Sequence, residues 1–179
     1  MYFHMSRIRT SRLCLMPCSL DVALSVINGH GTIRTMPGIR LAEGWPSGDL
    51  KDLLPWYANQ LKADPALYGW GIWLMIETSS NQVIGDIGFK GKPDRGSVEI
   101  GYSVVPAYRR WGYGFEAARA LIDWAFGHKE VDTIRAESEK DNTASIHLLE
   151  KLGMRRMEGE GGLLVWELGK ALSQIPTIP

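Results

Sequence analysis

Two glycines and two arginines stand close together in the segment 106–117, Pro-Ala-Tyr-Arg-Arg-Trp-Gly-Tyr-Gly-Phe-Glu-Ala. Gly112 and Gly114 lack the Cβ atoms that would hold a ligand away from the backbone. The first N–H groups of a helix have no partner inside it, and they carry the positive end of its dipole. Arg109 and Arg110 add positive charge beside them. This combination is suited to binding a pyrophosphate at the start of a helix.

Two other interpretations of the segment need to be weighed. A tight strand-to-helix turn with surface arginines would use the same residues. The spacing Gly112-x-Gly114-x-x-Ala117 also fits the permissive dinucleotide fingerprint, and Glu137 follows about twenty residues later, where that fold holds a ribose. However, six residues separate Val105 from Gly112, whereas the dinucleotide turn follows its strand directly. About forty residues follow Glu137, too few for the second half of a doubly wound sheet.

The first half of the chain has the spacing of one strand and two helices. Arg12 to Met16 is a short apolar stretch closed by Pro17, and 21–27 has helical spacing that ends at Asn28-Gly29. Residues 29–48 are rich in glycine and predict a loop. A helix is expected over 49–62, interrupted or kinked at Pro55.

From residue 71 the spacing becomes that of strands, with 71–78, 83–90 and 97–105 joined by short turns, the second a type I turn at 93–96. These segments predict an antiparallel meander. The later elements are a helix over 114–126, a strand over 131–137, a helix capped by Asn142 and ended by Gly153, a strand over 163–168 and a frayed tail. The fold class is α+β, with a mostly antiparallel sheet and a helix inserted between its fourth and fifth strands.

Composition narrows the classes of function. A chain of 179 residues predicts one domain, 1–179, with a core of about 11–169. Basic and acidic residues cancel, which disfavours nucleic acid as a partner, and no apolar run approaches the roughly 18 residues of a membrane span. Cys14 and Cys18 lack a second pair, and the histidines are scattered, so no metal is expected. The two cysteines are interpreted as small apolar residues in a reducing compartment, the cytoplasm.

Three segments, taken in order, resemble the motifs of the GNAT N-acetyltransferase family. Val98-Glu99-Ile100-Gly101-Tyr102, Pro106-x-Tyr108-Arg109 and Gly112-x-Gly114-x-Glu116-Ala117 together resemble its acetyl-CoA signature. Asn142-x-x-Ser145-x-x-Leu148-x-x-x-Leu152-Gly153-Met154 resembles its next motif, and Arg12-Leu13-x-Leu15-x-Pro17 resembles the opening strand of the subgroup that includes ribosomal-protein N-terminal acetyltransferases. The resemblance runs over nearly the whole chain and is densest over 83–154.

The resemblance implies the GNAT fold, a mostly antiparallel central sheet splayed between strands 4 and 5 and flanked by helices. It implies acetyl-CoA as cosubstrate, with the pantetheine arm along the strand before the turn, at Ser103, Val104 and Val105. Asn142 would contact the pantetheine or order the thioester end, and it could also cap its helix; Ser145 is a further cofactor-binding candidate. The pyrophosphate would bind the backbone of Arg109, Arg110, Trp111, Gly112, Tyr113, Gly114 and Phe115.

The chemistry implied is direct attack of a neutral amine on the acetyl thioester. Glu99, at the family position of a catalytic glutamate, is the first candidate for the base, with a solvated or structural carboxylate as the alternative, and Asp86 is the second candidate. The N–H of Val104 or Val105 would stabilise the oxyanion. Many members have a tyrosine that acts as the general acid at the position where this chain has Leu149. Ser145 is therefore the candidate acid, or simply a polar residue in the first helical turn.

The acceptor is expected to be a primary amine, either a protein N-terminus or a small molecule. Trp45, Trp56, Trp70 and Trp73 precede the cofactor motif and either line an acceptor groove or belong to the core. The alternative function is a non-catalytic acyl-CoA-binding sensor or interaction domain. Family members often dimerise, so a homodimer is a further expectation.

Overall fold

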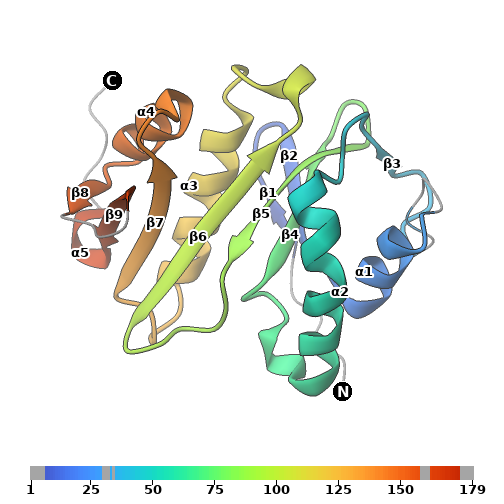
Figure 1. Cartoon of the computed structure of the whole chain (residues 1–179), viewed down its shortest axis with the longest axis horizontal. Helices are drawn as coiled ribbons and strands as arrows, with labels where there is room; N and C mark the ends of the chain where they lie inside the picture. The colour runs from blue at the N-terminus through green and yellow to red at the C-terminus, as the bar shows by residue number, and fades with distance from the viewer. Residues whose placement is uncertain (1–6, 30–32, 34, 158–161, 174–179) are drawn as a thin grey trace.

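The computed structural model describes residues 7–29, 33, 35–157 and 162–173, and its centre is one twisted sheet (Figure 1). The strands are β1 (Ile8–Arg9), β2 (Leu13–Pro17), β3 (Arg40–Leu41), β4 (Ile72–Glu77), β5 (Gln82–Phe89), β6 (Ser97–Val104), β7 (Thr133–Glu139), β8 (Arg155–Met157) and β9 (Leu163–Gly169). The helices are α1 (Leu20–Ile27), α2 (Gly48–Ala63), α3 (Tyr113–Phe126), α4 (Thr143–Lys151) and α5 (Lys170–Ser173), with short 3₁₀ turns at Pro65–Leu67 and Pro106–Tyr108.

The strands lie in the order β1-β2-β4-β5-β6-β7-β9-β8, and β3 pairs with β5 away from this path. Neighbours are antiparallel except for the parallel pairs β6–β7 and β3–β5. Parallel neighbours need a crossover, and α3 supplies it between β6 and β7. The predicted α+β class, the meander and the inserted helix are therefore confirmed.

The sheet opens between β6 and β7. The two strands pair only where Ser97, Val98 and Glu99 face Thr133, Ile134 and Arg135. Beyond Glu99, β6 continues to Val104 while still paired with β5 on its other side. The second half of β6 therefore has a free edge among the described residues. This is the splay expected between the fourth and fifth predicted strands, which are β6 and β7 in the structure.

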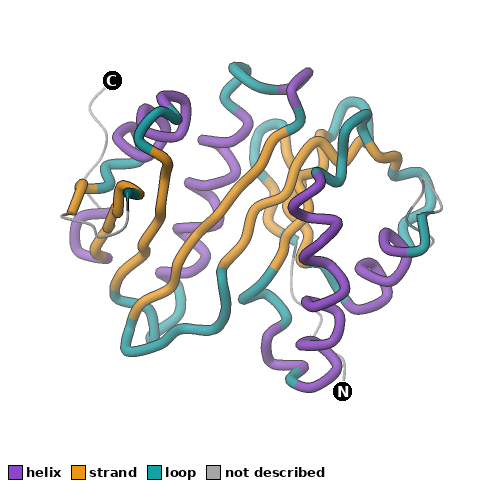
Figure 2. Tube along the Cα trace, viewed as in Figure 1, coloured by secondary structure: helices purple, strands orange, loops and turns teal. Residues whose placement is uncertain are grey.

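Helices cover both faces of the sheet (Figure 2). The α1–α2 pair packs together, and α2 approaches the sheet where the Tyr57 ring fills the space beside Gly71. On the other face α3 packs on β6 and β2, and α4 on β7. One apolar cluster runs from Leu13 to Leu168 and joins these layers.

The structure differs from the sequence-based expectation in four places. Pro55 lies on the exposed side of an uninterrupted α2, where water can replace the lost hydrogen-bond donor. The turn before β6 has positive φ at both Arg95 and Gly96, which a type I turn does not allow. The chain after Gly169 is helical over Lys170–Ser173, with the rest outside the described residues. The two- and three-residue strands β1, β3 and β8 were not predicted, because they are too short to show a period.

Candidate functional site

The glycine-rich turn exposes a row of unused backbone donors. Arg110 and Gly112 both have positive φ, 66° and 82°, and Gly112 caps α3. The first N–H of the row to be used inside the chain is that of Glu116, which donates to the Gly112 carbonyl at 3.0 Å. Within the described chain, the N–H groups from Arg110 to Phe115 have no hydrogen-bond acceptor outside the helix. They form a set of free donors at the positive end of a helix, as an anion site requires.

The two arginines of the turn have different roles. The Arg109 Nε donates to the Val104 carbonyl at 2.8 Å, so this side chain holds the turn against the end of β6. The Arg110 guanidinium is exposed and has no partner among the described residues. Arg110 is therefore the cation of the pair that remains available to a phosphate, while Trp111, 68% exposed, lies at the rim of the turn.

Residues near the start of the chain hold the turn in place, which the sequence did not reveal. Glu116 accepts hydrogen bonds from the Thr10 hydroxyl at 2.6 Å and from the Arg12 backbone and Nε at 2.8 and 2.7 Å. Arg12 also donates to the Trp111 carbonyl at 2.8 Å and lies over the Tyr113 ring. Burial alone would raise the pKa of Glu116, but these hydrogen bonds outweigh it and hold the pKa below the usual value. Arg12 and Glu116 both belong to the quoted motifs, but only the fold brings them together.

The two glycines also differ. A Cβ on Gly112 would meet only the Arg12 guanidinium, at 3.5 Å, so this glycine is required by its positive φ and by the approach of a ligand. A Cβ on Gly114 would lie 3.1 Å from Leu148 of α4. Gly114 therefore permits close packing of α3 on α4, in addition to the backbone approach expected from the sequence.

The hydrogen bonds of β6 show which of its donors are free. The Val105 N–H donates to the Ile84 carbonyl at 2.9 Å, and the Glu99 carbonyl accepts from the Lys90 N–H at 2.9 Å, so both face β5. Successive backbone groups in a strand point to opposite edges. The N–H groups of Tyr102 and Val104 therefore face the splay, and Val104, not Val105, is the available donor of the two expected.

At the other side of the splay, α4 presents Ser145. Asn142 caps this helix by accepting from the Ser145 N–H at 3.1 Å, which confirms the capping role. The Ser145 hydroxyl lies 2.9 Å from the Tyr102 hydroxyl of β6, a contact that the sequence did not suggest. Burial raises the pKa of Tyr102, and the hydrogen bond with Ser145 only partly opposes it. Leu149, at the family's tyrosine position, is fully buried.

Glu99 lies on the opposite face of β6, where its carboxylate pairs with Lys90 of the segment after β5. Lys90 also pairs with Glu137 of β7 at 3.2 Å. Burial opposes the charge of Lys90, but the two carboxylates outweigh it and raise its pKa. Glu137 thus belongs to an ion-pair network at the base of the splay, and the antiparallel sheet excludes the dinucleotide fold in which it would hold a ribose.

Asp86 shares this face and lies directly opposite Ser103 in the β5–β6 register. Its carboxylate accepts a hydrogen bond from the Trp45 Nε1 at 3.0 Å. Burial raises the pKa of Asp86 to about 6, and the indole donor only partly opposes this. Trp45 thus comes to the site from the segment between α1 and α2.

The other predicted aromatic residues are divided between core and surface. Trp70 and Trp73 are buried in a ring cluster with Phe89 and Trp124, whereas Trp56 is exposed. Cys14 and Cys18 are buried free thiols, as expected, and burial raises the pKa of Cys18 to about 12.

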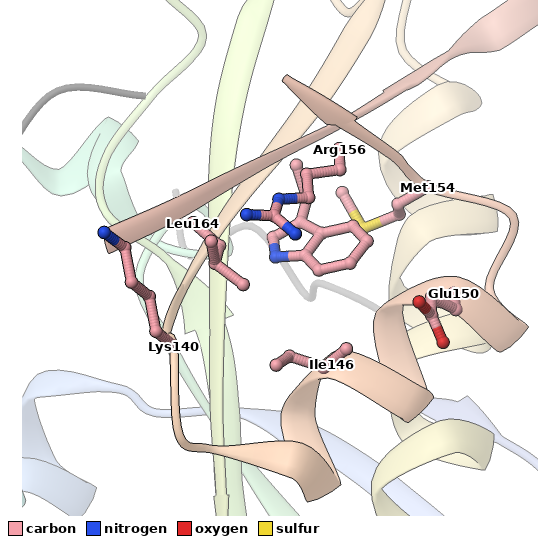
Figure 3. Close-up of a pocket in the computed structure, with 7 residues that line it drawn as sticks. Lys140, Ile146, Glu150, Met154, Arg156 and Leu164 are labelled. Atoms are coloured by element: carbon pink, nitrogen blue, oxygen red, sulfur yellow. The ribbon is translucent and has the colours of Figure 1, made fainter. Parts of the chain in front are cut away.

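A cavity of about 380 Å³ lies apart from the splay, between α4 and the β8–β9 pair (Figure 3). Its walls combine apolar side chains such as Ile146 and Leu164 with Lys140, Glu150 and Arg156. Ser145 is not among the lining residues, so this cavity is separate from the candidate site. The described residues include no cluster of three or more His, Cys, Asp or Glu that could hold a metal. None of the helices in the described ranges is long and apolar enough to span a membrane.

Comparison with known proteins agrees with this geometry. The sequence profile of the family described as "Acetyltransferase (GNAT) domain" matches residues 12–155. A Bacillus subtilis (strain 168) protein named "Uncharacterized N-acetyltransferase YjdG" is 33% identical over 150 residues, covering 82% of this chain and 88% of that protein. The chain therefore belongs to the GNAT acetyltransferase family, and it is an acyl-CoA-dependent N-acetyltransferase.

Solved structures share the fold at low sequence identity. A GNAT-family acetyltransferase from Bacillus anthracis superposes with a TM-score of 0.63 at 20% identity, covering 93% of this chain and 99% of that one. RimL, a ribosomal L7/L12 α-N-protein acetyltransferase solved in complex with coenzyme A, superposes with a TM-score of 0.61 at 13% identity, covering 92% and 98%. At these identities the likeness establishes the fold.

Proposed function

We propose that this protein transfers an acetyl group from acetyl-CoA to a primary amine by direct attack on the thioester. The observation that carries the proposal is the row of free N–H groups from Arg110 to Phe115, next to the free edge of β6. The first feature is suited to the pyrophosphate and the second to pairing with the amide groups of the pantetheine arm. Together they support a CoA-shaped ligand better than a simple phosphate.

The catalytic roles are assigned by position. Val104, whose N–H faces the splay, stabilises the oxyanion formed when the amine attacks. Glu99 takes the proton of the amine through intervening water molecules, and Ser145 gives a proton to the departing thiolate. A thiol has a pKa of about 8.5, so the thiolate is already a modest leaving group and the acid contributes less than the base.

Binding and turnover test the proposal separately. Calorimetric titration is expected to show binding of acetyl-CoA and CoA and none of NAD; tight binding of NAD with no response to CoA would overturn the assignment of the turn. Turnover is then measured with acetyl-CoA and a panel of amines. N-terminal peptides of ribosomal proteins enter this panel because the name of RimL describes such an acceptor, and polyamines and amino acids represent small acceptors. Binding without turnover of any amine would favour an acyl-CoA sensor.

A further inference from the structure

Asp86 is a half-buried carboxyl group to which the catalytic roles above assign no task. Its one hydrogen bond within the described chain is from Trp45, at 3.0 Å. None of the lysines, arginines and histidines that the structure describes forms an ion pair with it. Buried carboxylates are normally paired, because an unpaired buried charge is costly. Asp86 thus offers a carboxylate that no cation of the described chain neutralises.

A cation bound to Asp86 would lie on the face of the sheet that also carries Ser103. Asp86 is directly opposite Ser103, and side chains in such pairs have Cβ atoms about 4.5–5.5 Å apart. Ser103 precedes Val104, the donor assigned to the oxyanion. Glu99, by contrast, is four residues from Ser103, about 13 Å along an extended strand. Asp86 is therefore nearer than Glu99 to the position where the amine attacks.

Trp45 donates to this carboxyl group and also lines a neighbouring cavity. A cavity of about 390 Å³ between α1, α2 and the segment before α2 is lined by Trp45, Leu41, Leu54 and Lys51 among others, whereas Asp86 is not among its lining residues. This volume is within the range of small-molecule sites, which are mostly apolar with a few polar groups. The indole N–H fixes one oxygen of Asp86, which orients the carboxylate before a ligand arrives.

We propose that Asp86, held by Trp45, is the binding site for the ammonium group of the acceptor. The acceptor is selected as a cation, beside the indole of Trp45. The ligand class follows from the proposed function, in which the acceptor is an amine. The site itself follows from the unpaired carboxylate and its register with Ser103.

The first experiment needs no turnover, so it remains decisive even if no acceptor is found. The Trp45 indole N–H resonance, assigned with Trp45→Phe, is followed by NMR in the CoA complex during titration with butylamine or with butanol. Butylamine is expected to shift this resonance, butanol is not, and Asp86→Asn is expected to abolish the response. The same response to amine and alcohol, or a response that persists in Asp86→Asn, would overturn the proposal.

The second experiment uses the acceptor from the turnover panel. Asp86→Asn keeps an oxygen for the Trp45 donor but removes the charge, so the KM for the amine is expected to rise roughly tenfold or more while the affinity for acetyl-CoA is unchanged. Asp52→Asn, the same change on the exposed side of α2, is the control and is expected to leave both unchanged. An unchanged KM for the amine in Asp86→Asn would overturn the proposal and show that Asp86 is only a structural partner of Trp45.

Discussion

The contact between Ser145 and Tyr102 places a phenol beside the candidate acid, although the family's tyrosine position holds the buried Leu149. A hydroxyl of serine is a weak acid by itself, and its orientation is free unless a partner fixes it. Tyr102 supplies that partner from β6, and its raised pKa keeps the phenol protonated. We infer that Tyr102 positions the Ser145 hydroxyl for proton transfer to the thiolate.

Tyr102→Phe tests this role. The expected result is a loss of about tenfold in kcat with an unchanged KM for acetyl-CoA, and Ser145→Ala is expected to behave alike. Because the two hydroxyls act as one unit, the double variant should lose little more than either single one. Tyr108→Phe, which removes a hydroxyl bonded to Gln82 instead, is the matched control. Fully additive losses in the double variant would show that the two residues act independently.

Glu99 is the second residue whose role can be separated by experiment. Glu99→Gln keeps the shape but removes the base, so the rate is expected to fall about 10²–10⁴-fold near neutral pH. The defect should shrink toward about pH 10, where a lysine-like amine is increasingly neutral. Glu137→Gln removes the other carboxylate bound to Lys90 and serves as the control in the same pH–rate profile.

The result at each pH decides between roles for Glu99. An unchanged rate near neutral pH would discard Glu99 and leave Asp86 or a path through water. A loss of the same size at all pH values would make Glu99 a positioning residue. The ion pair with Lys90 gives such a structural role a physical basis.

At the scale of elements, local patterns predicted most of the fold. Alternation predicted β4, β5 and β6, and helical spacing with the Asn142 cap predicted α4, because these signals lie within a few consecutive residues. The free edge of β6 was expected only through resemblance to a family. Its free donor, Val104, depends on the register with β5, which no local pattern contains. The same reason applies to the Arg12–Glu116 bonds, whose partners are separated by 104 residues.

The start of α3 gives a prediction about an element. Gly112→Val is expected to weaken acetyl-CoA binding at least about tenfold, because the side chain enters the ligand's space and φ is unfavourable. Gly114→Val is expected to weaken binding and also to lower stability, since it presses on Leu148. Calorimetry and urea unfolding measure the two effects. Gly29 also has a positive φ, 71°, and nothing lies close to its Cβ position, so Gly29→Val reports backbone strain alone. Wild-type affinity in Gly112→Val would place the phosphate elsewhere.

At the scale of the whole molecule, β6 separates two chemical environments. Ser145 and Tyr102 meet on the face covered by α3 and α4, whereas Glu99 and Asp86 lie on the opposite face. The cosubstrate and the acceptor would therefore approach β6 from different faces of the sheet. The acetyl thioester and the amine would meet at the free edge of this strand. The Arg12–Glu116 bonds attach the first strands to this arrangement, so the candidate cofactor turn depends on packing against the start of the chain.

An unpaired carboxylate that the fold partly removes from water should reduce the stability of the molecule as a whole. The folded pKa of Asp86, about 6, lies above the unfolded value of about 3.9, so its full stabilising contribution exists below pH 4 and is lost as pH rises through 6. Asp86→Asn avoids this loss, and its free energy of unfolding at about pH 7 is expected to exceed the wild type by about 1–3 kcal/mol. Urea unfolding at about pH 7 and pH 4 measures the difference, which should vanish at the lower pH. A variant less stable than wild type at pH 7 would show that the carboxylate serves the fold, whereas greater stability with poorer acceptor binding is the trade-off expected of a functional group.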